Sequence, residues 1–304
     1  MKHVRPVVAR QRSVIWILLG VLAEIMLTAA AVCALYIAWQ MWWTGVQSEH
    51  TQIETRQAVS WSDPGKAENV TIAQAQEGDP PVQPQNAQEG ELIAQVYIPR
   101  FGSQWQRNLV EGTTLTELNK HGLGHYTNSQ MPGQIGNFAF AGHRNGYGQP
   151  LGDVDKLQEG DPIIIRTQDY WYVYHYTKSE IVLPTDVEVV SSNPEEPGAT
   201  PTKRMLTMTT CEPKYSGEFS YWAKVSDGIP QELATTDTNG KVKFINNGKA
   251  SFASGITTLE PWIFGALAAY VVIFAAAAVA WRWPVLAAIH AGEREKPDFS
   301  IYGG

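Results

Sequence analysis

The chain has 304 residues, 44% of them hydrophobic, which is enough for one or two domains. The formal net charge is −7 and no basic block occurs, so we do not expect nucleic acid as a partner. There are only two cysteines, Cys33 in an apolar run and Cys211 in mid-chain, which excludes a disulfide framework and a Cys-x-x-Cys redox pair.

Two apolar segments predict transmembrane helices. Residues 14–38 follow a basic segment at 1–13 and are long enough to span a bilayer; a cleaved signal peptide is the alternative, but no clear cleavage site follows. Residues 261–281 form a second, uncharged span, followed by a tail at 282–304 that carries basic residues. The positive-inside rule then predicts a two-pass membrane protein with both termini in the cytoplasm.

The segments next to the two spans are polar. Residues 44–90 are rich in Gln, Glu, Asp and Pro and show no hydrophobic period, so we expect a flexible extracellular stalk. Residues 230–258 contain Asn-Gly turns and predict a second tether. Between them, residues 91–229 form the expected folded domain.

That domain reads as mainly β. Many short apolar strands separated by turn signals favour a closed or nearly closed β-barrel, with one short helix over Thr113–Lys120. The expected strands and extended segments are Leu92–Ile98, Phe101–Val110, Asn137–Gly142, Ile163–Arg166, Tyr170–Tyr176, Glu180–Leu183, Arg204–Cys211 and Phe219–Val225.

Cys211 is the first candidate for chemistry, because it ends a Thr-rich strand and is followed by a proline turn. Thiols attack as thiolates, and a nearby imidazole can take the proton and later return it to a leaving amine. His143 ends another short strand between Gly142 and Gly146 and is the candidate partner. A buried structural cysteine and a histidine bonded to a loop carbonyl are the alternatives, and the other candidate histidines are His121, His125 and His175.

A metal site is not expected. His121 and His125 are four residues apart, but Gly122 and Gly124 disfavour a helix there, and one cysteine with scattered histidines lacks the close paired spacing of structural zinc sites. No cofactor is predicted. A calcium site is left open by Asp153, Asp155 and Glu159, for which a solvated turn is the simpler interpretation.

Several short motifs occur in order between residues 91 and 229. Thr207-Met208-Thr209-Thr210-Cys211 resembles the sortase signature that ends in Thr-x-Thr-Cys, and Phe138-Ala139-Phe140-Ala141-Gly142-His143-Arg144 resembles the strand with the catalytic sortase histidine. Three further motifs match the same family, most closely class E sortases of Gram-positive actinobacteria. They are Ile98-Pro99-Arg100-Phe101, Gly124-His125-Tyr126 and Met131-Pro132-Gly133-Gln134-Ile135-Gly136-Asn137.

The resemblance implies an eight-stranded sortase β-barrel and a membrane-bound cysteine transpeptidase. It would cut an LPxTG-like C-terminal sorting signal, of the Leu-Ala-x-Thr-Gly type in class E, between Thr and Gly. Cys211 would form the thioester and His143 would act as general acid and base. Substrates would be surface proteins or pilins, and the acceptor amine would come from the peptidoglycan precursor lipid II or a pilin lysine, at the membrane lipid surface.

One family feature is missing. Sortases carry an arginine nine or ten residues after the cysteine, where this chain has Ser220 and Tyr221. Because strand alternation puts Arg204 on the opposite face from Cys211, it is a poor substitute. The remaining candidates for positioning substrate or oxyanion are Thr210, Tyr221, Arg144 and Lys214.

The missing arginine keeps a second hypothesis open, in which a degenerate sortase barrel binds sorting signals or pilins without chemistry. A third hypothesis is an unrelated structural protein built on a membrane hairpin.

Overall fold

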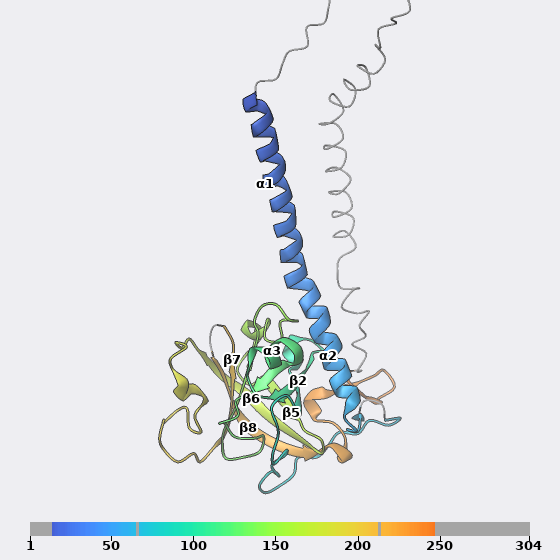
Figure 1. Ribbon diagram of the computed structural model, residues 1–304. Helices are drawn as coiled ribbons and strands as arrows, with labels where there is room; N and C mark the ends of the chain where they lie inside the picture. The colour runs from blue at the N-terminus through green and yellow to red at the C-terminus, as the bar shows by residue number, and fades with distance from the viewer. Residues whose placement is uncertain (1–13, 65–66, 212–213, 247–304) are drawn as a thin grey trace, which may run out of the picture. The chain divides into compact units, whose positions relative to one another are not determined.

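The computed structural model describes residues 14–64, 67–211 and 214–246 (Figure 1). The N-terminal segment 1–13, residues 247–258 of the expected tether, the expected span at 261–281 and the tail at 282–304 lie outside the described residues.

The described chain begins with one long apolar helix, α1 (Val14–Ala38). Its stretch Leu18–Ala38 has a mean hydropathy of 2.3 and no buried residue, and by length and composition it could cross a membrane. It is the one such helix found among the described residues. The predicted helix over 14–38 is thus confirmed as a helix.

The helix does not stop at the expected stalk. One π-helical turn, η1 (Trp39–Trp43), leads directly into α2 (Thr44–Ala58), which lies beside α3 and β2 in Figure 1. The buried side of α2 is mostly polar: Thr44, Val46, Ser48 and Gln52. A flexible stalk over 44–90 is therefore wrong at its start. The absence of an apolar stripe misled the prediction, because this helix docks through hydrogen bonds.

Residues 72–81 of the expected stalk also lie on the domain. The Ile72–Ile229 bridge, the bond from Gln76 N to Trp222 O at 2.9 Å and the bond from Tyr172 Oη to Pro81 O at 2.7 Å tie it down. Its backbone groups find partners on the barrel in place of water. Polar composition indicates exposure here but not freedom of movement.

Eight strands close into the predicted barrel, in the order β1-β2-β3-β4-β7-β8-β6-β5. Neighbours run antiparallel except for the pairs β2–β3 and β4–β7, which are parallel. The strands are β1 (Leu92–Tyr97), β2 (Gln106–Glu111), β3 (Gly122–His125), β4 (Gly136–Gly142), β5 (Pro162–Arg166), β6 (Tyr170–Glu180), β7 (Arg204–Thr209) and β8 (Lys214–Lys224).

Strand β3 (Gly122–His125) was not among the expected strands, because two of its four residues are glycine. Two strand boundaries also differ from expectation. Glu180–Leu183 is not a separate strand, because β6 continues without a break from Tyr170 to Glu180. The strand expected at Phe219 begins at Lys214, so β8 pairs with β6 from Glu180 to Tyr170. The residues added to β6, at 177–180, are polar and exposed, and those added to β8 include Gly217 and the buried Lys214, so neither segment shows hydrophobic alternation. The expected helix is confirmed as α3 (Leu115–His121).

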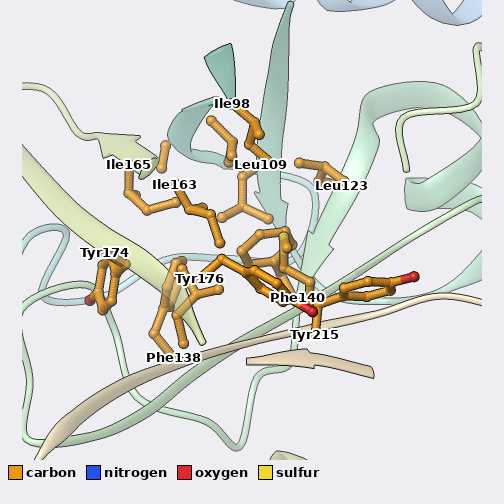
Figure 2. Close-up of a cluster of buried hydrophobic side chains, with 14 of the residues drawn as sticks. Ile98, Leu109, Leu123, Phe138, Phe140, Ile163, Ile165, Tyr174, Tyr176 and Tyr215 are labelled. Carbon is orange, nitrogen blue, oxygen red and sulfur yellow. The ribbon is translucent and has the colours of Figure 1, made fainter. Parts of the chain in front are cut away.

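The barrel interior is filled by large apolar side chains (Figure 2). Phe138 and Phe140 of β4 meet Tyr174 and Tyr176 of β6 there, and Leu206 and Met208 of β7 belong to the same cluster. Because alternate residues of a strand face opposite sides, these side chains mark the positions of β4 and β7 that face the barrel interior, and the residues between them face outward.

A second apolar layer covers the outside of β5, β6 and β8. It contains Ile164, Trp171 and Val173 together with residues from the segment after the barrel, up to Phe244 of the hairpin β9 (Ala234–Thr236) and β10 (Val242–Phe244). Residues 230–246 are therefore part of the folded domain and do not form a tether.

Candidate active site

The parallel pairing of β4 and β7 brings the two candidate catalytic residues to one edge. The last pair in register is Ala141 with Thr209, and His143 and Cys211 each follow that pair by two residues. Parallel strands end at the same edge of a sheet. Residues 68 apart in sequence are thus brought to one edge of the barrel by the register of β4 and β7.

Cys211 lies just beyond the end of β7 and is exposed as a free thiol. Leu206 and Met208 point into the barrel, so Thr207 and Thr209 fall on its outer side by alternation, and Cys211 follows Thr209 by two residues. The Thr209 hydroxyl lies 2.8 Å from that of Tyr126. A thiol at this position is held by the strand on one side and remains open to a peptide substrate.

His143 follows the last residue of β4 and is half-buried. Its Nε2 lies 2.7 Å from Oδ1 of Asn119, and its ring stacks on Tyr147 with 5.2 Å between ring centroids. Because an amide oxygen only accepts, Nε2 carries the proton and Nδ1 keeps its lone pair. Burial lowers the pKa of His143, which favours the neutral imidazole. A neutral ring can accept a proton from a thiol.

The glycine before His143 is required by packing. A Cβ on Gly142 would lie 2.6 Å from Cδ2 of Leu123 and 3.0 Å from Cγ of Leu151. Both leucines are fully buried. The close approach of β4 to these side chains therefore sets where the chain leaves the sheet, and with it the position of His143.

Thr210 lies between the outward Thr209 and the thiol. Its Oγ1 is buried and has no hydrogen-bond partner among the residues that the structure describes. A buried hydroxyl without a partner costs free energy, so such groups are uncommon and often serve a site. It is a hydrogen-bond donor directly before the candidate nucleophile Cys211.

Arg144 is the arginine nearest in sequence to His143. It forms an ion pair with Asp155, a residue of the short helix η4 (Val154–Lys156), and Asp155 Oδ1 also accepts a hydrogen bond of 3.1 Å from Tyr215 Oη. Burial, followed by the bond to Asp155, raises the pKa of Tyr215 to about 12. This network links the loop after His143 to β8, the strand after Cys211.

Two other sequence candidates are engaged elsewhere. Lys214 is buried, with Nζ 3.2 Å from Oε2 of Glu180. Tyr221 packs against the outer apolar layer, and its hydroxyl donates to Glu232. Arg204 donates to Gly133 O and Asp79 at the start of β7, far along the strand from Cys211.

Ser220, where the family arginine was expected, is an exposed residue at a bulge of β8. The pairing of β7 with β8 explains why it is not beside the thiol. Glu218 pairs with Met205, six residues before Cys211, and Ser220 lies still further along. Six strand residues span roughly 20 Å at ~3.3 Å per residue.

The other histidines have other neighbours. His125 is fully buried between Glu111, 2.8 Å from its Nδ1, and Ser129, 2.9 Å from its Nε2, which fixes the turn between β3 and β4. His121 faces Glu117, and His175 pairs with Pro162 inside the sheet. Over the described part of the chain, no group of three or more His, Cys, Asp or Glu is placed to hold a metal ion.

Two neighbours of the imidazole were not found by sequence reasoning. Asn119 and Tyr147 lie 24 residues before and four residues after His143, and neither belongs to a motif that indicates catalysis. Asn119 is placed by α3, which begins at the cap Thr114, whose Oγ1 accepts from Glu117 N, and ends at Gly122 with φ of 94°. Only the fold brings it to His143.

Comparison with known proteins agrees with this architecture. A family model for the sortase domain matches residues 96–224. Sortase SrtE2 of Streptomyces coelicolor is 31% identical over 66% of this chain and 79% of its own length, and SrtE1 of the same organism is 29% identical over 71% and 59%. The solved SrtA sortase from Actinomyces oris is 36% identical and covers 53% of this chain and 96% of its own, with a TM-score of 0.50.

Sortases are cysteine transpeptidases, which suits an exposed thiol at the edge of the barrel where β4 and β7 both end. With an eight-stranded barrel, a matching family model and similar Streptomyces relatives, this chain belongs to the sortase family and is a class E-like sortase.

Proposed function

We propose that Cys211 is the nucleophile and His143 the general acid and base of a transpeptidase that cuts a sorting signal between Thr and Gly. The register of β4 and β7, which brings the chain segments of His143 and Cys211 to one edge of the barrel, carries this proposal. The lowered pKa of His143 and the exposure of the thiol support the two roles.

The steps follow from the protonation states. Nδ1 of neutral His143 takes the Cys211 proton, and the thiolate attacks the Thr carbonyl carbon of the bound signal. The imidazolium then returns the proton to the Gly nitrogen as the C–N bond breaks, which leaves a thioester on Cys211. An incoming amine attacks the thioester, gives up a proton to His143 and restores the thiol.

Thr210 is the proposed donor to the oxyanion. Its buried Oγ1 without a described partner lies directly before the nucleophile, where the charge develops. Arg144 is the proposed source of positive charge, since the ion pair with Asp155 holds it in the loop after His143. We propose no role at the thiol for Lys214 or Tyr221, whose polar atoms are paired with Glu180 and Glu232.

The proposed substrates are surface proteins or pilins with a Leu-Ala-x-Thr-Gly type signal, and the proposed acceptor is an amine of lipid II or a pilin lysine. The class E-like relationship and the apolar helix α1 support this. The proposed location is the cell membrane, with two passes, both termini in the cytoplasm and the catalytic domain outside.

The test is cleavage of a fluorogenic Leu-Ala-x-Thr-Gly peptide by the full chain in detergent, with mass spectrometry of the enzyme. We expect a thioester on Cys211, its loss in Cys211→Ala, and full activity in Cys33→Ala, which removes the other cysteine. The absence of cleavage and of any adduct on Cys211, across several signals and pH values, would overturn the enzyme assignment.

A sortase-fold binding protein without chemistry is the second candidate. The observation that favours it is the pairing of both cations near the site, Arg144 with Asp155 and Lys214 with Glu180. In that case a sorting peptide would bind equally well to the wild type and to Cys211→Ala, and no thioester would form.

A further inference from the structure

Helix α2 buries an unusual stripe of polar side chains. Thr44, Ser48 and Gln52 are 4%, 2% and 1% exposed, and their spacing of four places them on one side of the helix. Buried polar groups require partners, so this stripe specifies what the helix contacts more strictly than an apolar stripe would.

The C-terminal end of the stripe, at Gln52, binds α2 to the barrel. Asn108 of β2 donates from its backbone N to Oε1 of Gln52 at 3.0 Å and from Nδ2 to O of Gln52 at 2.9 Å. Arg56 donates to Oδ1 of the same asparagine at 2.9 Å. These bonds are buried or partly buried and fix the helix against a central strand.

The middle of the stripe contacts the end of α3. Ser48 Oγ donates to Lys120 O at 3.4 Å, and the Gln52 side chain packs over Gly122, where an added Cβ would lie 3.2 Å from Gln52 Nε2. Lys120 follows Asn119 directly, and Gly122 comes three residues after it. The last turn of α3, which presents Asn119 to His143, is therefore held by α2.

The N-terminal end of the stripe, at Thr44, contacts the loop after His143. Tyr147 N donates to Oγ1 of Thr44 at 3.2 Å. Beside it, a Cβ on Gly45 would lie 3.3 Å from N of Gly148, so the two backbones meet at close range. Tyr147 is the residue whose ring stacks on His143.

We propose that Thr44, Ser48 and Gln52 are positioning residues of the sortase reaction, acting through Asn119 and Tyr147 on His143. Asn119 selects the tautomer with the proton on Nε2, and Tyr147 sets the ring plane, so that Nδ1 is turned to the thiol side. One helix holds both contacts of the imidazole. That helix lies outside the matched sortase domain at 96–224. The proposal rests on the proposed roles of Cys211 and His143.

The test uses the full chain in lipid nanodiscs and two readouts, kcat/KM on the fluorogenic peptide and the ¹⁵N chemical shifts of the His143 ring. Asn119→Ala should lower kcat by about tenfold with KM within twofold, and should replace the single Nε2–H tautomer by a mixture. Gln52→Leu and Thr44→Val should each lower kcat by roughly threefold to tenfold. Gln57→Ala, an exposed position on the same helix, is the matched control and should change neither readout.

Asn119→Gln, which keeps an amide oxygen, should recover part of the kcat lost in Asn119→Ala. In the Asn119→Ala background, Gln52→Leu should cost less than it does alone, because both changes act on one imidazole. Where Gln52→Leu fails to fold, Thr44→Val and Gly45→Ala carry the same comparison at the other end of the helix.

Wild-type kcat and unchanged His143 shifts in folded Gln52→Leu and Thr44→Val would overturn the positioning role. A wild type without activity on any sorting peptide would instead contradict the proposed function. The ¹⁵N shifts would still decide whether α2 orients the ring in that case.

Discussion

Replacing Thr210 by Val should make the protein more stable and less active. Val has nearly the same shape and keeps the strand preference, but it lacks the hydroxyl whose Oγ1 is buried with no described partner. Burying an unpaired hydroxyl costs about 1–3 kcal/mol, so its removal should raise the free energy of unfolding by about 1 kcal/mol. For a domain of this size that is a Tm higher by roughly 2–4 °C.

The neighbouring threonine is the matched control. Thr209 Oγ1 lies 2.8 Å from the Tyr126 hydroxyl, so Thr209→Val breaks a hydrogen bond and should lower stability by about 1 kcal/mol. The same chemical change at adjacent residues should thus shift Tm in opposite directions. Thermal unfolding followed by tryptophan fluorescence of the full chain in detergent measures both.

Activity separates the two variants further. If Thr210 donates to the oxyanion, Thr210→Val should lose about 10²–10³-fold in kcat. A lower Tm for Thr210→Val, like that of Thr209→Val, would refute the conclusion that its hydroxyl is unpaired. An unchanged kcat would refute its role in catalysis.

Three further predictions concern His143, the glycine before it and the position where the family arginine was expected. Burial lowers the pKa of His143 from its usual 6.5, and the neutral ring is the proposed base. The value of kcat/KM should therefore fall on acidification with a midpoint below pH 6.5. A midpoint at or above pH 6.5 would contradict this role. Gly142→Ala forces a Cβ to 2.6 Å from Cδ2 of Leu123, which should lower the free energy of unfolding in denaturant by about 1–3 kcal/mol and reduce activity. A variant as stable as the wild type would show that the Leu123 side chain can move aside at no cost. Ser220→Arg should change kcat/KM by less than about threefold, because Ser220 lies beyond the Glu218–Met205 pair, roughly 20 Å along the sheet from Cys211; a gain of tenfold or more would contradict this register.

The barrel could be predicted from the sequence because its strands depend on short-range signals. Alternating apolar residues predicted most of the strands, and the resemblance of two short motifs predicted Cys211 and His143 as a catalytic pair, which the register of β4 and β7 supports. Strand β6 was predicted too short because its last residues are paired with β8 and show no apolar alternation. Pairing partners are a property of the sheet and not of one segment.

The contacts of α2 and of the imidazole could not be predicted in the same way. Gln52 and Asn108 are joined over 56 residues and Asn119 and His143 over 24, and each pair is made of ordinary polar residues. A polar segment can be free in solvent or docked through buried hydrogen bonds, and composition does not separate the two. The position of Ser220 could not be predicted from the sequence either, because it depends on the register of β7 against β8.

The contact between Thr44 and Tyr147 also has a consequence for substrate choice. Thr44 follows the end of the apolar stretch at Ala38 by six residues, which is about 9 Å of helix at 1.5 Å per residue. With α1 upright in the bilayer, α2 would hold the loop beside His143 at most about 9 Å above the apolar layer, since residues 39–43 are π-helical and rise less than an α-helix. An extended peptide covers that height with about three residues. Proteins whose Thr–Gly bond lies only a few residues from their own membrane helix should therefore be cut faster than those with a long spacer.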